Sequence, residues 1–243
     1  MPFAPVLHSE WLKIRTLRSL VAGLGALVLV TAAFSALAGL DNAADADADF
    51  DPLFSAFFGV SFGQIAAITF GAQAVSSEFQ GGALRVSLSA VPHRGRWFAA
   101  KATAIGVPVL AVGLLTGCVS LAVGKAVLGD RASAISWAEG LRGVVGCGIY
   151  LALMALFAAG LATLLRSGVA TLSILIPFLL IVSFVVGDVS GSAADFLPDK
   201  AGQVALHETW GGALGPWTGL AVTAVWAGAA LLAGAWSVRR RDA

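Results

Sequence analysis

Charged residues are scarce in this sequence. Of its 243 residues, 12% are Asp, Glu, Lys or Arg, whereas 58% are hydrophobic. A soluble domain has about 25% charged residues, so the composition excludes an ordinary soluble protein and favours a membrane protein. The net charge of +1 gives no general attraction to nucleic acid, and no nucleic-acid partner is expected.

Cysteine and histidine are also rare. Cys118 and Cys147 each lie inside an apolar run, which argues against a disulfide framework or a Cys-based metal site and favours plain packing. His8, His93 and His207 fall in three separate polar segments. No metal site is expected.

A nucleotide-binding loop is missing as well. In the nearest lookalike, GCVSLAVGKA, Gly124-Lys125 is followed by Ala126 and not by Ser or Thr, so the hydroxyl for Mg²⁺ and the phosphate loop are both absent. The apolar runs contain no clearly buried Asp, Glu or His, which disfavours an intramembrane enzyme and a proton-coupled antiporter. The chain is expected to be non-enzymatic, with no cofactor of its own.

What the sequence does contain is long apolar runs. A helix that crosses a bilayer needs about 20 mostly apolar residues, and the runs do not alternate as strands of a membrane barrel would. The expected fold is an all-α integral membrane protein, one transmembrane domain over 1–243, with six spans. The predicted spans are 20–40, 53–75, 102–127, 141–165, 168–187 and 217–238.

The first 19 residues form a basic, amphipathic stretch before the first run. Apolar residues recur at steps of three and four, while cations are available for anionic headgroups. We expect an interfacial helix, retained and not cleaved; the alternative is a mere basic flank to the first span. The predicted inner-leaflet contacts are Trp11, Lys13, Arg15 and Arg18.

Lys and Arg stay preferentially on the cytoplasmic side. If the N-terminus is cytoplasmic, the inner segments hold eleven of the fifteen Lys and Arg residues, and five Asp residues crowd the first outer loop, 41–51. The prediction is a multi-pass protein of the bacterial plasma membrane with both termini in the cytoplasm. The acidic loop lacks the Gly turn and final Glu of an EF-hand, so a solvated loop is favoured over a calcium site.

The longest inner loop, 76–101, reads SSEFQGGALRVSLSAVPHRGRWFAAK. It predicts a short helix that starts after Gly82 and stops at Val91, since the residue before a proline is pushed out of the helical region. Two interpretations stay open. The loop is either a solvated connection, basic only because Lys and Arg stay on the cytoplasmic side, or a docking element for a soluble partner.

The run of Glu78, Gly81, Gly82, Leu84, Arg85, Leu88, Pro92, Arg94 and Lys101 resembles the loop pattern of ABC-2 type exporter permeases, with Gly82 and His93 departing from the residues common there. This resemblance implies a permease that pairs with a second, identical or related permease and with two ATPase subunits, which bind the ATP and Mg²⁺. It also implies that the loop helix is a coupling helix, whose ATPase-facing residues are Glu78, Gln80, Leu84, Arg85 and Leu88.

In similar permeases the second and fifth spans line the pathway, which makes Phe58, Phe62, Gln64, Phe178 and Ser183 the candidates for cargo contact. An aromatic and amide lining suits a hydrophobic or amphipathic small molecule. For Gln64 the alternative is ordinary hydrogen bonding between helices. Gly113 and Gly117 form a GxxxG that predicts helix contact, and Pro108 and Pro177 predict kinks.

The outer segment 188–216 has more apolar residues than a free loop needs, so short helices are expected to fold back there as an outer re-entrant segment. Together these features predict the membrane subunit of an ATP-driven exporter of a compound such as an antibiotic, drug, peptide or lipid. The alternative is a non-transporting membrane anchor or immunity-type protein that binds a partner.

Overall fold

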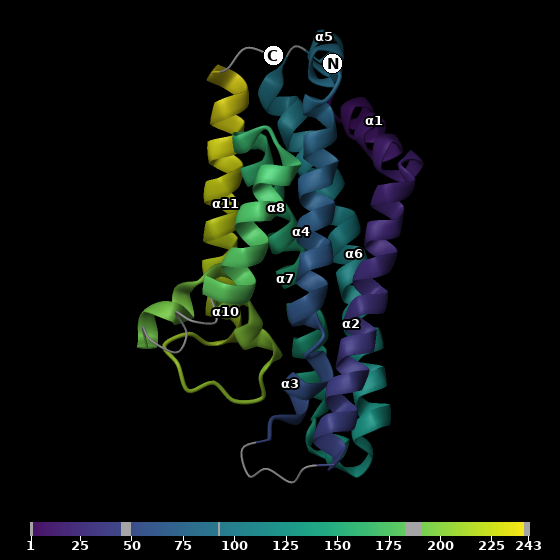
Figure 1. The fold of residues 1–243 in the computed structure, drawn as a ribbon, viewed down its shortest axis with the longest axis vertical. Helices are drawn as coiled ribbons and strands as arrows, with labels where there is room; N and C mark the ends of the chain where they lie inside the picture. Colours follow the sequence, from purple (N-terminus) through teal and green to yellow (C-terminus); the bar gives the residue numbers. More distant parts are fainter. Residues whose placement is uncertain (1, 45–49, 92, 183–190, 241–243) are drawn as a thin grey trace.

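The computed structural model describes residues 2–44, 50–91, 93–182 and 191–240, and within these ranges every regular element is helical. The long helices run roughly along one axis and form an elongated bundle (Figure 1). The chain is therefore an all-α protein over the described residues.

Five helical segments are long and apolar enough to cross a membrane: Arg18–Asp41, Pro52–Phe79, Arg94–Ala134, Trp137–Leu165 and Pro216–Arg240. They correspond to five of the six predicted spans. Their length and composition are compatible with a multi-pass membrane protein. The remaining predicted span, 168–187, is described only as far as Val182, and its apolar helix Gly168–Ile181 is shorter than a crossing needs. The count of six stays a prediction.

Several boundaries differ from the predicted ones. Helix α1 (Phe3–Thr16) is separated from α2 (Arg18–Ala44) by a break at Leu17. The second span consists of α3 (Pro52–Phe57) and α4 (Val60–Ser76) with a break at Phe58 and Gly59. Helix α6 (Arg94–Leu128) begins at Arg94, not at residue 102, so the connecting loop is shorter than predicted.

Helix α7 (Trp137–Leu165) is at the centre of the bundle and packs against α4, α6 and α11 (Pro216–Arg240). Gly113 and Gly117 of α6 permit this contact, because a Cβ on either would lie 3.0 Å from a backbone Cα of α7, at Gly148 and Val144. The predicted helix contact of this GxxxG is confirmed.

The two prolines inside spans behave differently. Helix α6 continues through the buried Pro108, whereas α8 (Gly168–Pro177) gives way at Pro177 to the π-helical turn η3 (Phe178–Val182). Of these two prolines, only Pro177 coincides with a change from α-helical to π-helical hydrogen bonding, whereas Pro108 removes a single hydrogen bond from a helix that continues past it.

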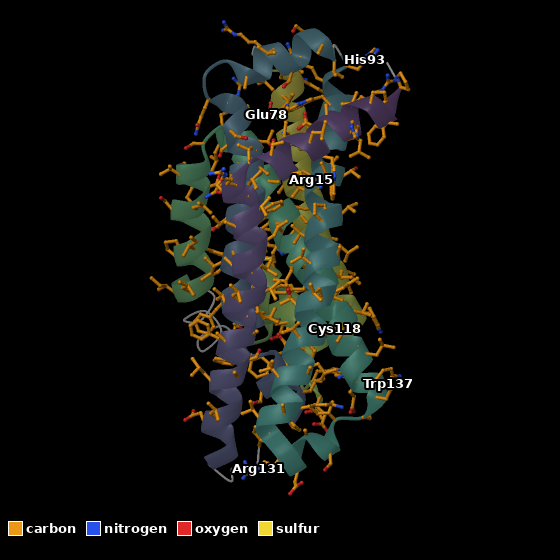
Figure 2. All side chains as sticks on the ribbon, turned by 90° about the vertical axis from the view of Figure 1, so that its right-hand side faces the viewer. Arg15, Glu78, His93, Cys118, Arg131 and Trp137 are labelled. Carbon is orange, nitrogen blue, oxygen red and sulfur yellow. The ribbon has the colours of Figure 1, made fainter. Side chains whose placement is uncertain are left out.

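The bundle has two distinct ends. Both termini lie at one end together with α5 (Ala83–Ala90), which we call the terminal end; α3 lies toward the other, which we call the distal end (Figure 1). Figure 2 shows α1 lying across the terminal end, with Arg15, Glu78 and His93 there and Arg131 and Trp137 toward the distal end. Predicted inner and outer residues thus lie at opposite ends of the bundle.

Toward the distal end, short helices follow η3: η4 (Gly191–Phe196), α10 (Pro198–Gln203) and η5 (Val204–Leu206). Helices α10 and η5 pack against α11 and α7, η4 packs against α10, and Ala205 and Leu206 are almost fully buried. Segment η2 (Gly129–Ala134) connects α6 to α7 at the same end.

Candidate functional site

Local sequence explains why a short helix stands out at the terminal end. After η1 (Ser77–Phe79), Gly81 and Gly82 have φ of 60° and 76°, values that glycine adopts without the steric cost a side chain would add. Helix α5 then runs over Ala83–Ala90 and ends at Val91, before the sequence position of Pro92. The predicted short helix is present, and its role as a coupling helix stays a prediction.

One face of α5 is apolar and packed. Leu84 is buried and Leu88 partly buried, against a second, smaller core cluster below the helix. The buried members of that cluster are Val6, Leu84, Val91, Trp97, Phe98, Ala100 and Val238. Through Leu84 and Leu88, helix α5 therefore joins an apolar cluster that also contains residues of α1, α6 and α11.

Other side chains of α5 are exposed. These are Arg85, Val86 and Ser89, with Val86 at 72%, and Gln80 just before the helix is exposed as well. Of the five residues predicted to face an ATPase, Gln80 and Arg85 are accessible. Glu78 and Leu84 are not, because both are buried inside the chain.

Glu78 belongs to a group of four charges, the buried Glu10, Glu78 and Lys101 and the partly exposed Lys13, which we call the four-charge cluster. Lys101 Nζ forms ion pairs with Glu10 and Glu78, at 2.7 Å to Glu78 Oε1. Lys13 Nζ lies 2.9 Å from Oε1 of both carboxylates. The Ser87 hydroxyl of α5 donates to Glu78 Oε2 at 3.0 Å.

The cluster compensates its own charge. Two carboxylates and two ammonium groups sum to zero, and Glu10, Glu78 and Lys101 are each at most 3% exposed. An isolated charge buried to this extent would be costly. The ion pairs are therefore needed for these side chains to be buried between the helices. Burial acts to lower the pKa of Lys13, but hydrogen bonds and attraction from Glu10 and Glu78 outweigh it and raise that pKa above its ordinary value.

This cluster corrects one prediction. The apolar runs were expected to hold no clearly buried acid, but Glu78 in the candidate span Pro52–Phe79 is buried, as is Glu10 in α1. The inner-leaflet contacts stay a prediction: Trp11, Arg15 and Arg18 are exposed, and the partly exposed Lys13 also pairs with these carboxylates. The sequence contains a pattern that indicates the burial of Glu10: it lies four residues from Val6 and from Ile14, the other buried residues of α1.

The five cargo candidates differ in their surroundings. Phe58 and Phe62 are half-buried, and Phe62 stacks on Phe34 of α2 at 4.1 Å between ring centroids. Phe178 is half-buried and packs on the main core. Ser183 lies outside the described residues.

Gln64 is buried in a polar network that also contains Ser61, Tyr150 and Gln203. The Tyr150 hydroxyl donates to Gln64 Oε1 and accepts from Gln203 Nε2 at 3.2 Å, while the Ser61 hydroxyl donates to Gln203 Oε1 at 3.0 Å. These bonds join α4, α7 and α10, which favours the alternative of interhelical hydrogen bonding for Gln64.

A second polar group lies at the distal end. Asp51 caps α3 by accepting from the Phe54 N–H at 2.9 Å, and its Oδ2 also lies 3.1 Å from His207 Nδ1 and accepts from the Glu208 N–H. Arg142 donates to the His207 carbonyl at 2.6 Å. The start of the second span is thereby joined to the segment that precedes α11.

No group of three or more His, Cys, Asp or Glu residues able to hold a metal ion occurs in the described ranges. Compared with known proteins, the chain matches no family model and no curated protein. The likeness of loop 76–101 to exporter permeases therefore stays a resemblance in sequence pattern.

Proposed function

We propose that this chain is the permease subunit of an ATP-driven exporter, with ATP hydrolysed on a separate ATPase subunit and α5 receiving its motion. The observation that carries the proposal is the way α5 is attached. A lever needs a rigid seat on the membrane helices and an accessible surface for its partner. Helix α5 has an apolar face that joins a cluster with residues of α1, α6 and α11, and it has exposed side chains at Arg85 and Val86.

The four-charge cluster offers a way for movement of α5 to reach the membrane helices. Glu78 at the end of the second span contacts Lys101 in α6, Lys13 in α1 and Ser87 in α5. A push on α5 would therefore act on three elements through buried ion pairs, which resist separation because an unpaired buried charge is costly. In the proposed role, Glu78 and Leu84 hold α5 in place, while Gln80, Arg85 and Val86 contact the ATPase.

The remaining parts of the proposal follow the resemblance. Two such permeases, identical or related, would pair with two ATPase subunits in the bacterial plasma membrane, with the terminal end in the cytoplasm. The cargo would be a hydrophobic or amphipathic compound that passes between the second and fifth spans.

The test is co-purification with an ATPase from cells that express the tagged full chain. We expect an ATPase to co-purify, and its retention and turnover to fall at least several-fold for Arg85→Glu and Val86→Asp, which change exposed side chains of α5. Arg239→Gln removes a cation at the same end, outside α5, and should leave both unchanged.

Two outcomes would overturn the proposal: no ATPase accompanies a folded chain, or the α5 variants bind and stimulate it as the wild type does. Either result would favour the alternative of a non-transporting anchor or immunity-type protein.

A further inference from the structure

We infer that a polar pocket beside Arg166 binds the acidic headgroup of an anionic amphipath, with the apolar tail lying along α8. The inference concerns binding by the chain itself and does not depend on the proposed export function. The pocket has a volume of about 370 Å³ and lies between the end of α4, η1 and the turn that joins α7 to α8.

The lining of this pocket is suited to an anion. Arg166 is the only charged residue among the described residues that line it, and the amides of Gln73 and Gln80 and the hydroxyls of Ser76 and Ser167 also border it. A guanidinium with neighbouring amide donors is a favourable set for a phosphate ester or a carboxylate. Glu78 in the adjoining η1 does not compete, because its carboxylate is engaged by Lys101 and Lys13.

The backbone at Arg166 supports a role for its side chain. Arg166 has φ of 55° and ψ of 24°, and it is the only residue other than glycine with positive φ in the described part of the chain. This conformation costs about 1–2 kcal/mol for a residue with a Cβ, and Gly or Asn would satisfy the turn at less cost. The guanidinium also lies 5.8 Å from the Phe79 ring, which holds it beside the pocket.

An apolar surface adjoins the polar one. Val169 and Leu172 complete the pocket lining, and the exposed apolar side chains of α8 and η3 continue from there with Ile174 at 56% and Ile181 at 61% exposed. The pocket itself lies where α4 and α7 end, which is the depth of lipid headgroups if these helices span the bilayer. A charged head at Arg166 and a tail along α8 therefore match an amphipath with an acidic head.

Two sources supply that chemistry: an anionic phospholipid of the bilayer and a single-chain amphipath that enters from solution. The test uses the purified full chain in a neutral maltoside detergent. Native mass spectrometry counts bound dioleoyl phosphatidylglycerol, with dioleoyl phosphatidylcholine as the zwitterionic comparison. Dodecyl phosphate and inorganic phosphate are then added as competitors.

We expect phosphatidylglycerol to bind in preference to phosphatidylcholine, and Arg166→Asn to weaken that binding about tenfold or more. Asn tolerates the left-handed backbone, so the variant should fold; an unchanged thermal midpoint checks this. Arg239→Gln removes a cation from the same end and should retain binding. Displacement by dodecyl phosphate would identify the ligand as an exchangeable single-chain amphipath, and its failure would identify a bilayer lipid.

Three results would overturn the inference. Equal binding of the two phospholipids would remove the acidic headgroup as the ligand. An equal loss for Arg166→Asn and Arg239→Gln would show non-specific attraction to the basic end. Displacement by both competitors, with inorganic phosphate as effective as dodecyl phosphate, would show that no tail is recognised. Failure of this test leaves the ATPase co-purification unaffected, so the two proposals fail separately.

Discussion

At the terminal end of the bundle, a few charged residues link α5 to the membrane helices through ion pairs and hydrogen bonds. Lys101 is 2% exposed and pairs with both buried carboxylates of the four-charge cluster. Removing one partner of a buried ion pair costs about 3–5 kcal/mol, whereas exchanging the whole group for apolar residues can be neutral. The cluster should therefore behave as a unit.

We predict that Lys101→Met lowers the free energy of unfolding by about 3–5 kcal/mol, measured by titrating detergent-solubilised protein with dodecyl sulfate. Lys200→Met, an exposed lysine at the distal end, should change it by less than about 0.5 kcal/mol. Adding Glu78→Gln to Lys101→Met should recover part of the loss, because one unpaired charge is removed. A Lys101→Met protein as stable as the wild type would contradict the role given to the cluster.

Among elements, the connection between α3 and the segment before α11 depends on one carboxylate. Partial burial of Asp51 acts to raise its pKa, but the hydrogen bonds from His207 and from the Phe54 and Glu208 N–H groups outweigh this and hold the pKa below 3.8, its ordinary value. A lowered carboxyl pKa stabilises the folded state above the unfolded pKa, and this stability is lost as the pH falls through the folded value.

We predict that the stability advantage of the wild type over Asp51→Asn is constant near neutral pH. It should shrink as the pH falls from about 4 toward and below the folded pKa. The measurement is the difference between their unfolding free energies as a function of pH, in which the protonation of other carboxylates largely cancels. Asp130→Asn, an exposed change at the same end, should show no such dependence. An advantage that persists unchanged at acid pH would argue against the charged Asp51 contact.

Local patterns explain how much of these elements the sequence could predict. The ends of α5 could be predicted from Gly82 and the Val91–Pro92 pair, because these residues restrict the local backbone. The helix contact at the GxxxG of α6 could be predicted because small residues permit close approach. The four-charge cluster was missed because its members come from three distant segments, and only the fold brings Glu10 to Lys101. Gln64 was a pathway candidate because of its place in the second span, with interhelical hydrogen bonding as the alternative. The sequence does not point to its partner Tyr150, which is 86 positions away.

At the scale of the whole molecule, the basic segments gather at one end. Arg94 near the start of α6 donates to the Val238 carbonyl near the end of α11, while Arg131 lies over Phe50 at the distal end. The structure thus separates the two predicted sides, and the positive-inside rule predicts which one faces the cytoplasm.

We predict that a cysteine placed at His93 reacts with a membrane-impermeant maleimide only after the cells are opened, whereas one at Ser133 reacts in intact cells. Both positions are exposed; His93 lies at the terminal end (Figure 2), and Ser133 belongs to η2, whose Arg131 lies toward the distal end. Cys118 and Cys147 are first replaced by Ala, and that background should remain unlabelled. Labelling of the His93 cysteine in intact cells would place α5 outside and remove the basis for contact with an ATPase.

The polar network around Tyr150 has a practical consequence. The chain contains one tyrosine, and its hydroxyl bonds both to α4 and to the short helix α10 at the distal end. The vibrational bands of that single phenol therefore come from one site. A shift in their frequency during turnover would show α10 separating from the bundle, with no label attached and no residue changed.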